Sequence, residues 1–279
     1  MYFNFKNFVL FILLATVISV SCKKQNTYID YNPAIFASKE FVSNQQMMVQ
    51  ILNTYFKSLT DSTLWADDHA LIDGADVYIQ YTPELLMEIK YPSWGNNDGY
   101  GHFRIGTINA VPETGFYEAG ALVNFYFDGF LYDKDTLEVD KMTVQNMEST
   151  EPSMYNFEVM IDSAIIIYSD TSGQQSFNMA QQFTLKKSAA STYTSPLDEI
   201  LITGAVEGIT MNLTTYSALV ADSSEIVDKY TCPWLKNGVA NLQVAGFDYP
   251  ALIYYPEADS CKNEYLIEID GNPFPFPFD

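Results

Sequence analysis

The sequence predicts a mostly β protein, with one N-terminal amphipathic helix followed by a large antiparallel β domain that forms either a sandwich or a strongly curved sheet. Apolar residues follow helical spacing only between residues 38 and 64. From residue 65 to 279 apolar and polar residues alternate in short runs, and turn-forming residues separate these runs. Helices do not alternate with the strands, which argues against a fold with a parallel sheet.

Residues 1–21 have the pattern of a signal peptide. Lys6 precedes an apolar run at 8–20, and this run is shorter than the roughly 20 residues that span a bilayer. Ser19-Val20-Ser21-Cys22 is similar to a bacterial lipobox, in which the chain is cut before the cysteine and the cysteine is lipidated. We therefore expect Cys22 to carry the lipid and residues 22–37 to be a tether.

The residues after Cys22 bear on the location of the protein. Lys23 and Lys24 follow it, and the first acidic residue is Asp30. This pattern favours an outer-membrane lipoprotein that faces the periplasm over one at the cell surface. The membrane is then a partner through the lipid, and several acyl chains make such an anchor stable.

The charge of the chain excludes one class of partner. Lys and Arg number 14 against 35 Asp and Glu, for a net charge of −21. Nucleic acid binding requires clustered cations that release counterions, so we expect no nucleic acid partner.

Cys232 and Cys261 are an even pair in an exported chain and are candidates for a disulfide. The bridge would stabilise the fold by about 3–4 kcal/mol through the entropy of the unfolded chain. The alternative is two buried thiols.

The helix at 38–64 is expected to begin at a capping box formed by Ser43 and Gln46. Its apolar stripe contains Met48, Ile51, Leu52, Tyr55, Phe56 and Leu59, and its polar complement contains Asn44, Gln45, Gln50, Asn53 and Ser58. We expect it to cover one end of the β core; a helix that binds a partner is the alternative.

The β domain contains about a dozen expected strands. They lie at 75–81, 85–91, 103–108, 121–127, 137–144, 164–168, 177–185, 200–211, 216–220, 239–245, 251–255 and 265–269. The segment Ile72-Asp73-Gly74-Ala75 recurs as Ile161-Asp162-Ser163-Ala164, each expected to open a strand. Two duplicated halves would explain the recurrence, and chance similarity between strands is the alternative.

The chain ends in alternating Pro and Phe, at Pro273, Pro275 and Pro277 and at Phe274, Phe276 and Phe278. In an extended strand the prolines remove the donors from one edge, and the rings share one face. We expect the last strand of a sheet, closed to further pairing. Addition to a partner's sheet is the alternative.

Several segments resemble a family of Bacteroidota lipoproteins with an N-terminal helix and a β domain rich in strands and turns. They are LTDS at 59–62, IDGADV at 72–77, DGYGHFRIGTI at 98–108, ITGAVEG at 202–208, and the region 232–271. Residues 255–258 and 261–263 depart from the family pattern. The resemblance implies the fold and no activity.

Motifs for nucleophiles, metals, phosphate loops and dinucleotides are missing, so we expect no catalytic residues, metal site or cofactor. Histidine occurs only as His69 and His102. His102 and Arg104 share a strand near Trp94, and these three are candidates for binding an anionic ligand. A structural role for the arginine is the alternative. Calcium stays open around residues 96–98 or at Asp128, Asp133 and Asp135, although neither place has the spacing of a known calcium loop.

The expected function is binding or assembly in the cell envelope rather than catalysis, with an envelope protein or a glycan as partner. A row of outward Trp and Tyr would favour carbohydrate binding. A pocket containing His102 would favour a hydrolase of glycoside type, and a large apolar cavity in a curved sheet would favour a carrier of hydrophobic ligands.

Overall fold

The computed structural model describes residues 29–97, 101–149, 151, 153–188, 194–257 and 259–278. Residues Asn32–Asp279 form one compact unit. The expected signal peptide and Cys22 lie outside the described residues. In the described part of the chain, two helices accompany one sheet of 15 antiparallel strands. The mostly β class is confirmed, and the sandwich alternative is wrong because all strands belong to one sheet.

The long helix α2 (Asn32–Leu59) begins earlier than the sequence suggested. Pro33 occupies its first turn, where the missing N–H of proline costs no hydrogen bond and its fixed φ suits the helix. Ser43 therefore lies inside α2, and the capping box expected there is wrong. The short helix α3 (Ser62–Asp67) has Asp61 as its N-cap, whose side chain accepts the N–H of Leu64 at 2.8 Å.

The strands follow the helices. They are β1 (His69–Ile72), β2 (Ala75–Gln80), β3 (Leu86–Asn97), β4 (Phe103–Pro112), β5 (Leu122–Tyr132), β6 (Asp135–Met147), β7 (Met154–Ile167), β8 (Gln174–Lys186), β9 (Glu199–Ile209), β10 (Thr215–Val220), β11 (Ile226–Lys229), β12 (Val239–Val244), β13 (Ala251–Tyr254), β14 (Tyr265–Ile269) and β15 (Asn272–Phe276).

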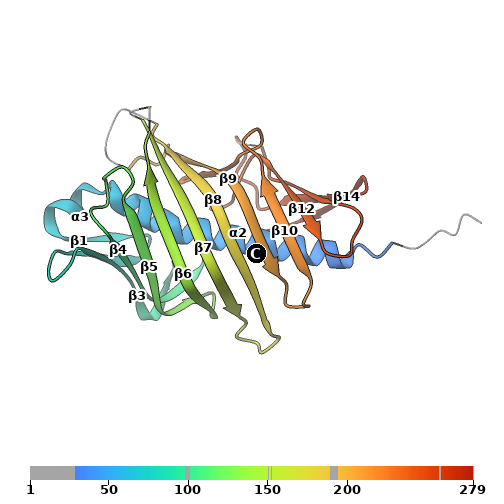
Figure 1. Ribbon diagram of the computed structural model, residues 1–279, viewed down its shortest axis with the longest axis horizontal. Coiled ribbons are helices and arrows are strands. Elements are labelled where there is room, and N and C mark those ends of the chain that lie inside the picture. Colours follow the sequence, from blue (N-terminus) through green and yellow to red (C-terminus); the bar gives the residue numbers. More distant parts are fainter. Residues whose placement is uncertain are drawn as a thin grey trace, which may run out of the picture. The chain divides into compact units, whose positions relative to one another are not determined.

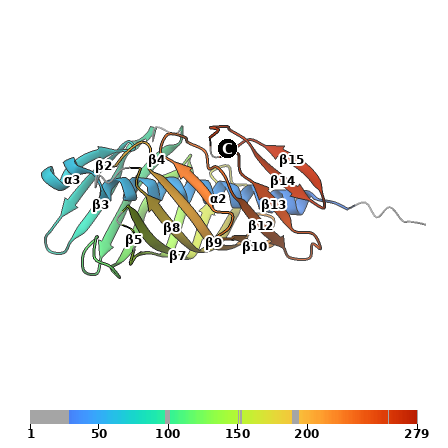
Figure 2. The ribbon, with the colours of Figure 1, turned by 90° about the horizontal axis from the view of Figure 1, so that it is seen from above.

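Most strands pair with their neighbours in the chain. The exceptions are β10, which pairs with β12, and β11, which pairs with the part of β9 that β10 leaves uncovered. Within the described residues β1 and β15 end the sheet and do not pair with each other. Figures 1 and 2 show that the sheet curves around α2, which crosses the strands on its inner face.

The two copies of the recurring segment adopt different structures. Asp73 and Gly74 form the turn between β1 and β2, whereas Asp162 and Ser163 lie within β7 at a shift in its pairing with β8. The expectation that both segments open a strand is wrong for the second. The segment therefore gives no support to duplicated halves.

Helix α2 is buried on all its faces along most of its length. The apolar stripe is buried as expected, but so are the polar residues Ser38, Glu40, Asn44, Gln45, Gln46, Gln50, Asn53, Thr54 and Ser58. Gln45 exchanges two side-chain hydrogen bonds with Gln181 of β8, at 3.0 and 2.9 Å. Asn53 donates to Asp228 of β11 at 2.9 Å. The helix is thus the centre of the core rather than a cover at one end.

The C-terminal segment matches the expected edge strand. β15 pairs only with β14 among the described strands. The three prolines are exposed, while Phe274 and Phe276 are half-buried and Phe278 is buried. The ring of Phe278 stacks on that of Trp234 with centroids 5.6 Å apart.

A disulfide joins Cys232 and Cys261, which are 29 residues apart. It ties the segment between β11 and β12 to the segment between β13 and β14. No helix in the described part of the chain is both long enough and apolar enough to cross a membrane.

Candidate functional site

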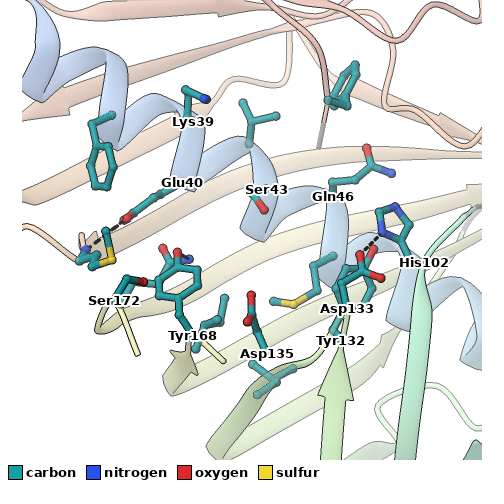
Figure 3. A pocket seen from close by; sticks show the side chains of 18 of the residues that line it. Lys39, Glu40, Ser43, Gln46, His102, Tyr132, Asp133, Asp135, Tyr168 and Ser172 are labelled. Carbon is teal, nitrogen blue, oxygen red and sulfur yellow. Dashed lines mark hydrogen bonds and ion pairs between the residues drawn. The ribbon is translucent and has the colours of Figure 1, made fainter. Parts of the chain in front are cut away.

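A cavity of about 410 Å³ lies between the N-terminal half of α2 and one end of the strands (Figure 3). Its lining comes from α2, from parts of β5, β6, β7, β8 and β14, from the turns that follow β5, β7 and β9, from the residue before β4, and from the C-terminal segment. The lining side chains are Phe36, Lys39, Glu40, Val42, Ser43, Gln46, Met47, His102, Tyr132, Asp133, Asp135, Leu137, Ile166, Tyr168, Asp170, Ser172, Gln175, Met211, Tyr265 and Phe278.

Turn chemistry places three carboxylates at one end of the sheet. Asp133 has a φ of 50° in the turn between β5 and β6, a conformation that aspartate tolerates better than most residues. Asp135 accepts the N–H of Ser169 at 2.8 Å. Asp170 accepts the N–H of Ser172 at 2.9 Å in the next turn, as aspartates in turns commonly do. These turns form the acidic rim of the cavity.

Glu40 projects from α2 toward the cavity wall (Figure 3). Its residue is only 6% exposed. Its two carboxylate oxygens accept the N–H of Met211 at 3.2 and 3.3 Å. Burial raises the pKa of Glu40 to about 7, against the lowering effect of this hydrogen bond. Glu40 therefore changes charge near neutral pH.

An amide network connects α2 to the wall behind Glu40. Asn44 and Gln175 exchange two hydrogen bonds of 3.0 Å. Gln175 also donates to the hydroxyl of Tyr168 at 2.7 Å. Burial raises the pKa of Tyr168, and the nearby charges of Glu40 and Asp135 raise it further. Tyr168 is therefore neutral and keeps its proton across the physiological range.

His102 lies at the other end of the cavity and pairs with Asp133. Its Nδ1 is 2.5 Å from Oδ2 of Asp133, and its ring stacks on Tyr132 with centroids 4.9 Å apart. Oδ1 of Asp133 accepts the N–H of Phe103 at 2.7 Å. Burial raises the pKa of Asp133, but the hydrogen bonds from His102 and Phe103 outweigh burial, and the pKa lies below its usual value. The pair is an aspartate that holds an imidazole in one orientation.

Arg104 does not line the cavity. It is fully buried against α2, where Nη1 donates to the carbonyl of Gln50 at 3.2 Å and to the hydroxyl of Tyr91 at 2.9 Å. Its guanidinium lies 5.5 and 5.7 Å from the ring centroids of Tyr91 and Tyr132. The arginine holds α2 against β3–β5, which is a structural role.

The three expected anion-binding residues do not form one site. Trp94 is 81% exposed, Arg104 is completely buried, and only His102 reaches the cavity. Strand alternation alone suggested a shared site, but it does not show where β4 begins or that Arg104 contacts α2. His102 precedes β4, and Arg104 points inward to α2.

The described residues contain no cluster of three or more His, Cys, Asp or Glu side chains arranged to hold a metal ion. This includes Asp128, Asp133 and Asp135, which the sequence left open as calcium ligands, whereas Asp98 of the other calcium candidate lies outside the described residues.

Most residues of the cavity, including Glu40, Tyr168 and Gln175, could not be identified as site residues from the sequence. One signal was present: Glu40, Asn44 and Gln45 are ionisable or amide residues on a helix that also carries a long apolar stripe. Their partners are 130 or more residues away in the chain, at separations of 131 for Asn44 and 136 for Gln45.

No family model, curated protein or solved structure matches the chain.

Proposed function

We propose that this protein is a lipid-anchored protein of the cell envelope that binds a small amphiphilic cation in the cavity beside α2. The anchor is the lipid on Cys22, and the protein faces the periplasm from the outer membrane. The lipobox-like segment supports the anchor, and the Cys232–Cys261 disulfide suits an oxidising compartment. The proposed role is binding, and an envelope partner would receive or supply the ligand.

The cavity is the observation that carries this proposal. A volume of about 410 Å³ is within the range of pockets that hold small organic ligands. Phe36, Val42, Leu137, Ile166 and Phe278 supply an apolar surface for the body of a ligand. Helix α2 fills the rest of the concave face of the sheet. If the protein were a carrier of hydrophobic ligands, its ligand would have to fit within this cavity.

The charges of the lining select the sign of the ligand. Glu40, Asp133, Asp135 and Asp170 face the cavity, against Lys39 and His102. The ammonium of Lys39 lies 5.3 Å from the ring centroid of Phe276. Since opposite charges a few ångströms apart attract and like charges repel, an amine is favoured over a carboxylate.

Calorimetric titration with octylamine, octanol and octanoate tests the ligand class. We expect octylamine to bind most tightly and octanoate most weakly. The double variant Asp135→Asn, Asp170→Asn should weaken octylamine binding by about tenfold and leave octanol binding unchanged. Asp248→Asn, an exposed acid in the segment between β12 and β13, is the matched control. Equal affinity for octanoate and octylamine would contradict the proposal.

The anchor has a separate test. Cys22→Ser should abolish the incorporation of labelled palmitate and release the protein from membranes. Protease treatment of intact cells should leave the wild-type protein whole. Removal by the protease would place it at the cell surface instead.

A hydrolase is the second candidate function, and the His102–Asp133 pair on the cavity wall favours it. An imidazole held by a carboxylate can act as a general base for a hydroxyl nucleophile or a water. Assays with nitrophenyl esters and nitrophenyl glycosides distinguish the two functions. Turnover that His102→Gln abolishes would favour the hydrolase. Under the binding proposal, neither protein turns these substrates over.

A further inference from the structure

A second hollow, of about 470 Å³, lies on the face of the sheet that points away from α2, over β6–β9. The orientation follows from β8, where Gln175 and Gln181 point inward and bond to α2, while Asn178 and Ala180 are exposed. The hollow is therefore separated from the cavity described above by the thickness of the sheet.

Small side chains form the floor of this hollow. Met160, Ala180 and Ala205 are paired in sequence across β7, β8 and β9, and Ala205 pairs with Leu219 of β10. Met160 is 44% exposed and Leu219 is 54% exposed, so two large apolar side chains stand at the ends of a row whose middle is alanine. Gly204 allows β8 and β9 to approach closely there, since a Cβ on it would be 2.5 Å from the carbonyl oxygen of Ala180.

Polar side chains run alongside this floor. Lys141 pairs with Asp162, and Asn178 pairs with Glu207. The irregularity in β7 links the two pairs, because the N–H of Ser163 donates to Oδ1 of Asn178 at 2.8 Å. This bond fixes the amide of Asn178, so the hollow has carboxylates, an amide and an ammonium group in one row beside an apolar floor.

A row of residues with a tyrosine at each end lies on the same outer face, beside the hollow. This row and the hollow together form a band from Tyr78 to Glu207. Tyr78, Glu88, Asn109 and Tyr126 are paired in sequence across β2–β5. Tyr78 is 36% exposed and Tyr126 is 58% exposed. Three strand spacings separate them, which is about 14 Å. Tyr126 and Lys141 each come one residue past the pair Phe125–Met142, so the row from Tyr78 to Tyr126 leads toward the hollow.

The chemistry of this band selects among polymers. The backbone groups of central strands are used within the sheet, whereas an extended peptide takes much of its affinity from backbone pairing at a sheet edge. The net charge of −21 and the carboxylates of Asp162 and Glu207 repel a polyanion. A neutral saccharide fits both, since its hydroxyls bond to carboxylate and amide groups and its C–H faces pack on tyrosine, methionine and alanine.

We propose that the outer face from Tyr78 to Glu207 binds a neutral polysaccharide, with the hollow over β6–β9 as the principal subsite. The carboxylates of Asp162 and Glu207 accept hydrogen bonds from sugar hydroxyls. Tyr126 stacks on a sugar ring at the mouth of the hollow.

Affinity electrophoresis and calorimetry with cellohexaose, mannohexaose, xylohexaose and laminarin test this site, with polygalacturonate as the anionic comparison. We expect the full protein to bind at least one neutral glycan and not polygalacturonate. Ala205→Phe fills the hollow and should abolish binding. Tyr126→Ala and Glu207→Gln should each weaken binding by about tenfold.

Tyr254→Ala is the matched control, because this half-buried tyrosine lies on β13, outside the band. Circular dichroism and Tm identify variants that do not fold, and Glu207→Gln keeps the shape of the side chain. Absence of binding to every neutral glycan overturns the proposal. Reversible dimerisation that Ala205→Phe abolishes also overturns it, since the face would then contact a second copy. Octylamine binding is expected to persist in all these variants, so the two sites are tested independently.

Discussion

At the scale of single residues, Glu40 makes the fold sensitive to pH. Its pKa is about 7 in the folded protein and 4.5 as the reference value, so the folded state binds the proton more tightly. Stability is then greatest below pH 4.5 as far as this group is concerned. It falls as the pH rises from 4.5 to 7, by roughly 3 kcal/mol in total, and does not change further above pH 7.

Glu40→Gln tests this dependence. The glutamine can still accept the N–H of Met211, and it has no charge to bury. We expect the variant to be more stable than the wild type at pH 7.5 and to lose less stability between pH 4.5 and 7, as measured by urea unfolding. Asp228 also has a pKa raised by burial, to about 6, and stays in both proteins, so the difference between them isolates Glu40. An equal slope in the two proteins would contradict the assignment.

Arg104 is a structural contact that lysine cannot replace. One guanidinium nitrogen donates to Gln50, Thr54 and Tyr91, and the group lies 5.5 and 5.7 Å from the ring centroids of Tyr91 and Tyr132. A compact ammonium group cannot reproduce this arrangement. Arg104→Lys should lower the free energy of unfolding by about 3 kcal/mol. The exposed exchange Lys90→Arg should change it by less than about 0.5 kcal/mol, and equal effects would be inconsistent with this role.

Some features of single residues could be predicted from the sequence, and others could not. Cys232 and Cys261 could be paired by counting, because they are the only two cysteines in the sequence besides Cys22 and two cysteines offer one bridge. The alternation of Pro and Phe fixed the exposure of each residue in the last strand. Arg104 could not be placed, because its partners come from α2 and β3, and no local pattern in the sequence links them.

At the scale of elements, β15 closes one edge of the sheet. On the edge of β15 that faces away from β14, the prolines have no N–H groups to donate. Replacing Pro273, Pro275 and Pro277 by alanine restores three N–H groups on the open edge. Light scattering after gel filtration should then show larger assemblies that grow with concentration.

Phe278→Ala is the comparison for the proline variant. It removes a buried ring that packs on Trp234, Tyr255 and Tyr265, so it should destabilise the protein by about 3–4 kcal/mol without altering its assembly. A proline variant that stays in the same assembly state as the wild type would show that the edge is protected in another way.

For helix α2, the sequence predicted the helix but not the residue at which it begins. Its apolar spacing predicted a helix, and the structure has one there. The start was misplaced because Ser43 and Gln46 match a capping pattern although both lie inside the helix. Gln46 instead bonds to the backbone of Pro233 and Leu235, and such long-range contacts leave no trace in local sequence.

At the scale of the whole molecule, the sheet and α2 depend on each other. The inner faces of β7, β8, β11 and β12 bury apolar side chains, and α2 fills the space between them. A protein lacking residues 32–59 should show no cooperative thermal transition and should bind the dye ANS. A synthetic peptide of residues 32–59 should restore both the transition and the near-UV circular dichroism. A sharp transition without the peptide would show that the sheet folds alone.

The antiparallel class followed from alternation, which predicted about a dozen of the 15 described strands and missed β1 and β11. The course of the sheet did not follow from it. Alternating residues show which side chains share a face, and they do not show whether two faces pack together or one sheet curves around a helix. The buried amides of Asn44, Gln45 and Asn53 decide this point, because they require partners on the sheet at several positions around α2.

The burial of so many polar groups on α2 has a consequence for biosynthesis. A ribosome makes α2 before any strand that will surround it, so the helix must wait until the final strand has been made. A helix that is apolar all round would aggregate during that interval. The amides and the carboxylate of α2 stay hydrated until they bond to the rest of the fold. The same polar groups therefore limit aggregation of the helix before folding is complete and stabilise the core afterwards.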